Sequence, residues 1–199
     1  MSSNSSLASS DLAFRRTTDV NRWPVRAAAV LLGSSLLWAS AKMQVPFWPV
    51  PMTMQTYVVL TLAALFGWRL GAATMGIYLA EGVLGLPVFA DTPTNGFGFA
   101  YIAGPTGGYL AGYLVAVVLV GVLTESRWNR SILSTAAVLL IGELTIVSLG
   151  CCWLAVQFGW EKAVTFGFGP FLLGDGVKLV LAIATVVYSR RLAARDNAW

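Results

Sequence analysis

Long apolar stretches separated by short polar turns make up most of this sequence. A helix needs about 20 mainly apolar residues to cross the roughly 30 Å hydrocarbon layer of a membrane. The stretches approach that length, and Arg69, in the turn Gly67-Trp68-Arg69, separates the second stretch from the third. The pattern therefore predicts an all-α integral membrane protein with a bundle of six transmembrane helices. The predicted helices cover residues 25–41, 53–68, 69–86, 104–124, 131–158 and 170–189.

The two ends of the chain differ in composition from its apolar middle. Residues 1–24 are rich in Ser, Asn, Asp and Arg, which predicts a mobile cytoplasmic tail. The predicted membrane domain covers residues 25–190, and residues 191–199 form a second short tail. The first apolar stretch allows another interpretation, because Arg26, an apolar run and Ala39-Ser40-Ala41 follow the order of a secretory signal and its cleavage site. Cleavage there would leave five spans.

Basic residues are distributed unevenly between the two sides of the predicted bundle. With six crossings, the arginines of the tails, of the turn after the second helix and of the loop after the fourth helix lie on one side. The loops of the other side offer only Lys42 and Lys162. The positive-inside rule then predicts a multi-pass protein of a bacterial inner membrane with both termini in the cytoplasm. This excess of basic residues on one side explains the pI of 9.3, so no nucleic-acid partner is needed, and the arginines are expected to contact anionic lipid headgroups. The arginines on the cytoplasmic side are Arg15, Arg16, Arg22, Arg26, Arg69, Arg127, Arg130, Arg190, Arg191 and Arg195.

Composition excludes most kinds of enzyme site. The chain has no histidine, which rules out Ser-His and Cys-His hydrolases and His-ligated zinc. Cys151 and Cys152 are too few for a thiolate metal site, and no metal or cofactor is predicted. The segment Gly104-Pro105-Thr106-Gly107-Gly108 lacks the Gly-Lys-Ser/Thr ending of a phosphate loop, so the chain is not expected to hydrolyse ATP. An intramembrane aspartyl protease needs two membrane aspartates, whereas Asp175 alone lies in a predicted span.

Polar side chains from separate segments gather in the outer half of the predicted membrane domain. Asp175 and Lys178 are three residues apart in the last helix and therefore share one of its faces. A charged side chain in the middle of a span costs about 2.5–3.5 kcal/mol, so such a pair indicates either a solute-binding cavity or a structural ion pair between helices. Glu143, in the fifth helix, has no obvious local partner, and we expect it to be protonated or hydrogen-bonded within the bundle. At the same outer level lie Gln55, Glu81, Asn95 and Tyr101.

Two loops on the outer side have an unusual composition. The segment Val45–Met52 contains three prolines and two aromatic residues. Proline removes backbone donors and prevents helix formation, so this loop is expected to be stiff and to fold back over the mouth of the bundle. The segment Leu86–Phe99 mixes aromatic residues with glycine and is a second candidate lid. The aromatic residues could equally form an interfacial belt, an alternative that does not explain the prolines.

The first predicted helix contains small residues at spacings of four. Such pairs allow a neighbouring helix to approach closely, including a helix of another subunit. The pairs are Ala29 with Gly33 and Ser35 with Ala39.

Several of these motifs occur in an order and spacing that resemble the BioY family. This family comprises the biotin-specific substrate-capture subunits (S components) of energy-coupling factor (ECF) transporters. The resemblance implies a six-helix bundle that binds biotin at its extracytoplasmic side, beneath the loops after helices 1 and 3. The matching stretches are Val45-Pro46, Pro49–Gln55, Gly67, Arg69–Gly71, Tyr78, Gly85–Phe89, Gly104–Leu110, Pro170-Phe171, Gly174-Asp175 and Lys178.

The resemblance associates Asp175, Lys178 and Asn95 with ligand binding, and the chemistry of biotin suggests a role for each of them and for the residues around them. Asp175 and Asn95 would bind the ureido ring of biotin, and Lys178 would neutralise its carboxylate or hold Asp175 in place. Gln55 belongs to the same expected site. The residues expected to cover the bicyclic ring are Phe47, Trp48, Phe89 and Tyr101.

Partners are implied by the same resemblance. They are a transmembrane coupling subunit, which the small residues of the first helix would contact, and two ATPase subunits. In this chain Gly33 stands where the family spacing would have Ala. The alternative is a stand-alone secondary transporter of biotin or of a related small carboxylate. Such transporters usually show internal repeats, and the 199 residues contain no convincing repeat.

Overall fold

The structure, a computed structural model, is built almost entirely of helices, which confirms the predicted all-α class. It describes residues 23–46, 48–92, 94, 96–126, 131–167 and 169–196. Phe47, Asn95 and most of the predicted N-terminal tail therefore lie outside the described residues. The elements are α2 (Trp23–Lys42), β1 (Gln44–Val45), β2 (Met52–Thr53), α3 (Gln55–Val83), α4 (Gly98–Ala103), α5 (Gly107–Glu125), α6 (Ile132–Phe158), α7 (Trp160–Gly167) and α8 (Gly169–Asp196).

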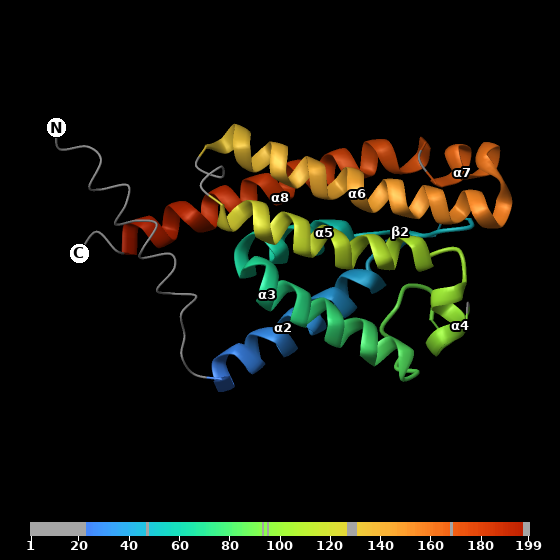
Figure 1. Cartoon of the computed structure of the whole chain (residues 1–199), viewed down its shortest axis with the longest axis horizontal. Coiled ribbons are helices and arrows are strands. Elements are labelled where there is room, and N and C mark those ends of the chain that lie inside the picture. Colours follow the sequence, from blue (N-terminus) through green and yellow to red (C-terminus); the bar gives the residue numbers. More distant parts are fainter. Residues whose placement is uncertain are drawn as a thin grey trace.

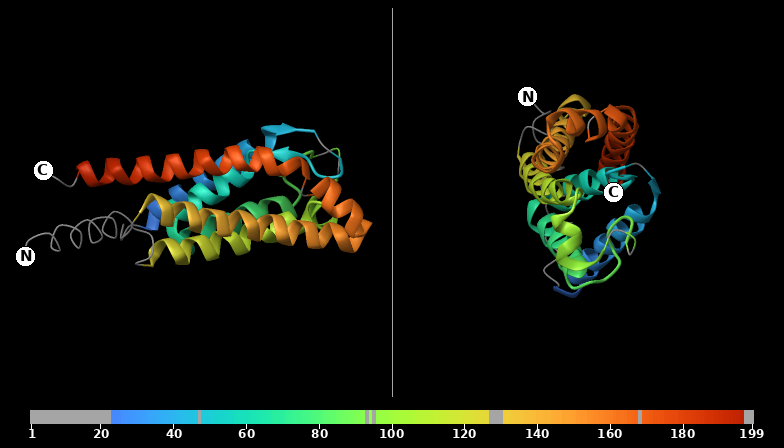
Figure 2. Two further views of the ribbon diagram at one scale, coloured as in Figure 1. Left: turned by 90° about the horizontal axis from the view of Figure 1, so that it is seen from above. Right: turned by 90° about the vertical axis from the view of Figure 1, so that its right-hand side faces the viewer.

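The long helices lie alongside one another in an elongated bundle (Figures 1 and 2). The start of α2 and the end of α8 point toward the same end of the bundle (Figure 1). The short helices α4 and α7 lie at the opposite end, which we call the loop end. The helix α5 packs against both α3 and α6, and α8 packs against α3 and α6. The last helix continues to Asp196, beyond the predicted end of the span at residue 189 and into the predicted C-terminal tail.

Gly67 divides α3 into two segments, at the place where the sequence predicts a turn between two spans. Its φ of 74° and ψ of 177° are not helical, and a positive φ strains any residue with a Cβ atom. A Cβ atom at Gly67 would also collide with the side chain of Glu125. The Glu125 carboxylate accepts a hydrogen bond from the Trp68 backbone N–H at 3.2 Å, which ties the turn to the end of α5.

The outside of the bundle is strongly apolar. Leu133 and Val156 of α6 have 81% and 82% of their side chains exposed, and large apolar residues of α2, α5 and α8 are exposed as well. A surface of this kind is unfavourable in water but matches the hydrocarbon of a membrane. Within the described residues, α2, α3, α5 and α6 are long and apolar enough to cross a membrane. The chain is thus a multi-pass membrane protein, and the count of six crossings remains a prediction.

The two proline- or glycine-containing loops fold back onto the loop end. Strands β1 and β2 pair antiparallel, with Gln44 opposite Thr53, and between them Val50 is buried. In the loop after α3, Val88 and Phe89 are buried as well. An apolar loop that packs in this way removes its side chains from solvent. We call the two segments the covering loops, and their predicted role as lids stays a prediction.

Candidate functional site

Asp175 and Lys178 form a buried ion pair on α8. Each residue is only 5% exposed, and the Lys178 ammonium contacts the Asp175 carboxylate one helical turn away. The ammonium also donates a hydrogen bond of 2.9 Å to the backbone carbonyl of Thr53 in β2. The pair therefore links α8 to the strand beside the proline-rich loop.

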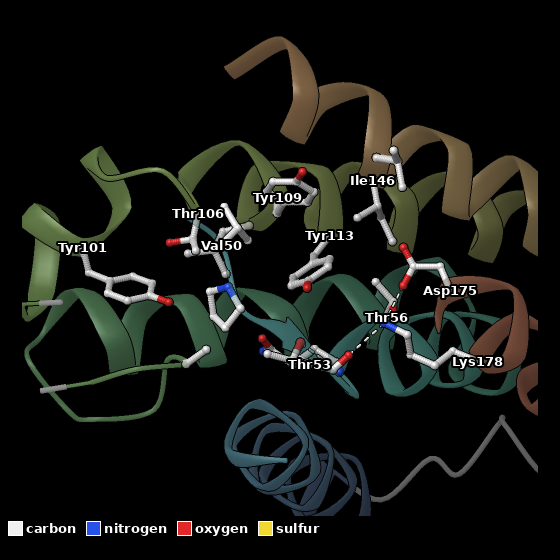
Figure 3. A pocket seen from close by; sticks show the side chains of 15 residues that line it. Val50, Thr53, Thr56, Tyr101, Thr106, Tyr109, Tyr113, Ile146, Asp175 and Lys178 are labelled. Carbon is white, nitrogen blue, oxygen red and sulfur yellow. Dashed lines mark hydrogen bonds and ion pairs between the residues drawn. The ribbon is translucent and has the colours of Figure 1, made fainter. Parts of the chain in front are cut away.

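The same pair lines a cavity at the loop end (Figure 3). The cavity has a volume of about 30 Å³, which holds one or two water molecules but no larger organic ligand. Its wall includes Val50, Pro51 and Ala90, which belong to the two covering loops. A larger ligand would need some of the lining residues to move.

Tyrosines form much of the remaining wall. Tyr109 and Tyr113 are four residues apart on α5, so both point from the same helical face into the cavity region (Figure 3). The Tyr109 hydroxyl donates a hydrogen bond of 2.8 Å to the Gly167 carbonyl at the end of α7. Gly150 of α6 leaves room for the Tyr109 ring, since a Cβ atom there would overlap it. Neither tyrosine is among the site residues predicted from the sequence, although their spacing of four residues would have placed them on one helical face.

Tyr101 reaches the cavity from the short helix α4. Its ring stacks on Phe89, with centroids 4.9 Å apart. Burial raises the pKa of the Tyr101 phenol to about 12, against a smaller opposing effect of Thr106. The hydroxyl therefore keeps its proton at neutral and moderately alkaline pH and remains available as a hydrogen-bond donor.

Gln55 lines the cavity at the start of α3, as predicted for a site residue. Its side-chain amide donates a hydrogen bond of 2.7 Å to the Tyr78 hydroxyl. Tyr78 in turn donates to the Val88 carbonyl at 3.1 Å, and its ring packs edge-on against Phe89. This chain of contacts joins the two halves of α3 to the covering loop, so Gln55 both faces the cavity and supports its cover.

The sequence model of the BioY family matches residues 12–195. The chain belongs to the BioY family. It is 36% identical over 156 residues to the probable biotin transporter BioY of Pyrococcus horikoshii, a match that covers 77% of this chain and 89% of that protein. It is 31% identical over 160 residues to the biotin transporter BioY of Thermotoga maritima, with coverage of 80% and 92%. Among solved structures, it resembles the 2.1 Å crystal structure of the S-component for biotin from an ECF-type ABC transporter. That match has a TM-score of 0.70 and 25% identity, and covers 87% of this chain and 93% of the other.

Two residues predicted to cover a ligand in this BioY-family chain do not line the cavity in the structure. Trp48 is 67% exposed and packs edge-on against Phe158 of α6 and Phe166 of α7, with centroids 5.9 and 5.8 Å away. These rings give Trp48 aromatic partners outside the cavity, and its predicted position over the ligand stays a prediction. Phe89 is buried against Tyr78 and Tyr101, and Tyr101 forms the cavity wall in its place.

The small residues of the first helix do not share one face. Gly33 is buried, and a Cβ atom there would lie 2.6 Å from Thr74 of α3, so this glycine serves packing within the chain. Ser35 and Ala39 are exposed, while Ala29 is half-buried. Of the four residues predicted to contact another subunit, Gly33 packs within the chain and Ser35 and Ala39 are accessible, and the contact itself stays a prediction.

The end of α2 holds the covering loop after α3. The Lys42 ammonium donates hydrogen bonds to the Phe89 carbonyl at 2.8 Å and to the Thr92 hydroxyl at 2.9 Å. Beside it, the Gln44 side-chain amide donates to the Asp91 carboxylate. We call these contacts of Lys42 and Gln44 the latch, because they connect the loop after α3 to the end of α2 and to β1.

Proposed function

We propose that this chain binds biotin with high affinity in the cavity at the loop end and takes part in biotin uptake as the S component of an ECF-type transporter. The observation that carries the proposal is the buried ion pair of Asp175 and Lys178 in the cavity wall. A purely structural ion pair would be expected in a close-packed interface between helices. A ligand site needs polar groups that line a cavity, as this pair does. Family membership supports the same assignment.

The chemistry of biotin suits the described wall. The carboxylate of Asp175 can accept an N–H of the ureido ring, and the ammonium of Lys178 can neutralise the ligand's carboxylate or hold Asp175 in place. The apolar bicyclic ring can pack against the rings of Tyr101, Tyr109 and Tyr113. Asn95, which the family resemblance implies at the ureido ring, lies outside the described residues and stays a prediction.

We further infer that the loop end faces the outside of the cell and that both termini are cytoplasmic. The uneven distribution of arginines supports this orientation. A coupling subunit would then contact the accessible side of α2, which presents Ser35 and Ala39, and two ATPase subunits would supply the energy for release inward. In this arrangement the chain is a transporter subunit and leaves ATP hydrolysis to its partners.

Calorimetric titration of the purified chain with biotin tests the proposed binding. We expect tight binding of biotin and no measurable binding of lipoate, which has the same pentanoate chain and a sulfur-containing ring but no ureido group. The difference is expected because a buried carboxylate without its N–H partner is left unsatisfied. Equal binding of the two ligands would contradict a role for Asp175 at the ureido ring, and absence of biotin binding would refute the proposed function.

Uptake into proteoliposomes distinguishes an S component from a secondary transporter. With the chain alone, we expect bound biotin but no accumulation inside the vesicles. Addition of a coupling subunit, ATPase subunits and ATP should produce accumulation. Accumulation by the chain alone, driven by an ion gradient, would instead support the alternative of a stand-alone secondary transporter.

The latch predicts an effect on the rate of ligand exchange. Lys42→Met removes the hydrogen bonds to the loop after α3, and because Lys42 is exposed we expect a loss of only about 1 kcal/mol in the closed state. Release of labelled biotin should accelerate about fivefold. Lys162→Met, at an exposed lysine of the same end, is the matched control and should leave the release rate unchanged. An unchanged rate in Lys42→Met would show that the latch does not limit opening.

A further inference from the structure

A second buried carboxyl group lies next to the ion pair of the proposed site. Glu143, in the middle of α6, is only 5% exposed. It interacts electrostatically with Asp175 and Lys178 of α8, the helix that packs against α6. Ile146 and Val147, one turn further along α6, line the cavity, and Figure 3 shows Ile146 beside Asp175. Glu143 is not among the residues proposed above to contact the ligand.

The hydrogen bonds of this cluster are incomplete when both carboxyl groups are ionised. Among the described residues, neither Glu143 oxygen has a hydrogen-bond partner. Asp175 Oδ1 contacts the Lys178 ammonium but likewise lacks a hydrogen bond of normal geometry. Two ionised carboxylates only accept hydrogen bonds, so they cannot satisfy each other. A single proton between them supplies the missing donor.

The net charge of Glu143, Asp175 and Lys178 also indicates that the two carboxyl groups hold one proton. Two carboxylates and one ammonium would leave a net negative charge in a buried site, which is strongly unfavourable without compensation. Among the described residues, Tyr113 of α5 also interacts with Glu143, but a phenol cannot supply the positive charge that would compensate a second carboxylate. With one proton, Glu143, Asp175 and Lys178 together are neutral.

We propose that Glu143 is a positioning residue of the ligand site, which holds a proton and donates it in a hydrogen bond to the Asp175 carboxylate. This bond would orient Asp175 toward the cavity while Lys178 balances its charge. The inference rests on the proposed function, because it assigns Glu143 a part in the same biotin site.

Two substitutions separate this role from an ionised or a purely structural Glu143. Glu143→Gln keeps the length of the side chain, is neutral and can still donate a hydrogen bond to Asp175. Glu143→Leu has a similar size but cannot donate. We expect the affinity for biotin to change less than about threefold in Glu143→Gln and to fall at least about tenfold in Glu143→Leu, as for the loss of a hydrogen bond to a charged group.

An infrared spectrum of the ligand-free protein supplies a readout that packing alone would not change. We expect a carbonyl band of a protonated, buried carboxylic acid at neutral pH, and this band should be absent from Glu143→Gln. Thermal unfolding of both variants in detergent verifies that each is folded before its spectrum and its affinity are compared with those of the unaltered chain.

The outcomes distinguish this inference from the proposed function. An equal loss of affinity in both variants would mean that Glu143 is ionised and that its charge is needed, which would overturn the inference. Unchanged affinity in both variants, or a spectrum without the acid band, would also overturn it. If the unaltered chain binds no biotin but shows the band, and the band is lost in Glu143→Gln, the shared proton stands while the proposed function fails.

Discussion

Replacement of Asp175 by asparagine is expected to weaken biotin binding about 100-fold or more. The substitution removes a charged hydrogen-bond acceptor from the cavity wall and leaves the buried Lys178 ammonium without its counter-charge. A hydrogen bond to a charged group is worth about 1.5–3 kcal/mol, and an unpaired buried charge adds to the loss. Calorimetric titration of the purified variant with biotin measures the effect.

Glu161→Gln is the matched control for this substitution. It makes the same change from carboxylate to amide at the loop end, but Glu161 is exposed at the start of α7 and outside the cavity wall. We expect wild-type affinity from this variant. If Asp175→Asn also binds biotin with unchanged affinity, Asp175 is not a ligand contact.

Replacement of Lys178 by methionine is expected to lower both biotin affinity and stability. The ammonium is the partner of Asp175 and also donates to the Thr53 carbonyl, so its loss leaves a carboxylate buried without compensation. Breaking a buried pair from one side costs roughly 3–5 kcal/mol, part of which uptake of a second proton by the two carboxyl groups can relieve. Thermal unfolding in detergent should show a clearly lower midpoint, and titration should show no tight binding of biotin.

The double variant Asp175→Asn with Lys178→Met separates a structural ion pair from a ligand site. Removing both charges eliminates the uncompensated buried charge, so stability should recover most of what Lys178→Met alone loses. Biotin affinity should not recover, because the ligand has lost both charged partners. Recovery of affinity together with stability would indicate that the pair only fastens α8 to β2.

Much of the architecture follows from local patterns. Apolar segments of membrane-spanning length, the turn at Gly67 and the face shared by Asp175 and Lys178 depend on residues close together in the chain, and the structure agrees with each. Local rules suffice here because backbone hydrogen bonds in a membrane must be satisfied within each helix. The positions of the helices along the chain could therefore be predicted to within a few residues at most boundaries.

The composition of the cavity wall depends on contacts between distant segments. Tyr109 and Tyr113 face the cavity because α5 packs between α3 and α6, a relation that no local pattern contains. For the same reason Trp48 packs against Phe158 and Phe166, and Gly33 against Thr74 of α3. Each of these side chains has several possible neighbours of similar character, and the packing of whole helices selects among them.

Glu143 shows what a local sequence pattern can predict and what only contacts between distant segments decide. From the chain alone, a lone carboxyl group in an apolar span indicates that a proton or a hydrogen bond must compensate it, because a bare charge there is too costly. Only the tertiary structure identifies the compensating group. Asp175 lies 32 residues away in the chain and comes near Glu143 because α8 packs against α6. Helix lengths and burial costs are local quantities, whereas the partners of a buried charge arise from the way separate helices come together.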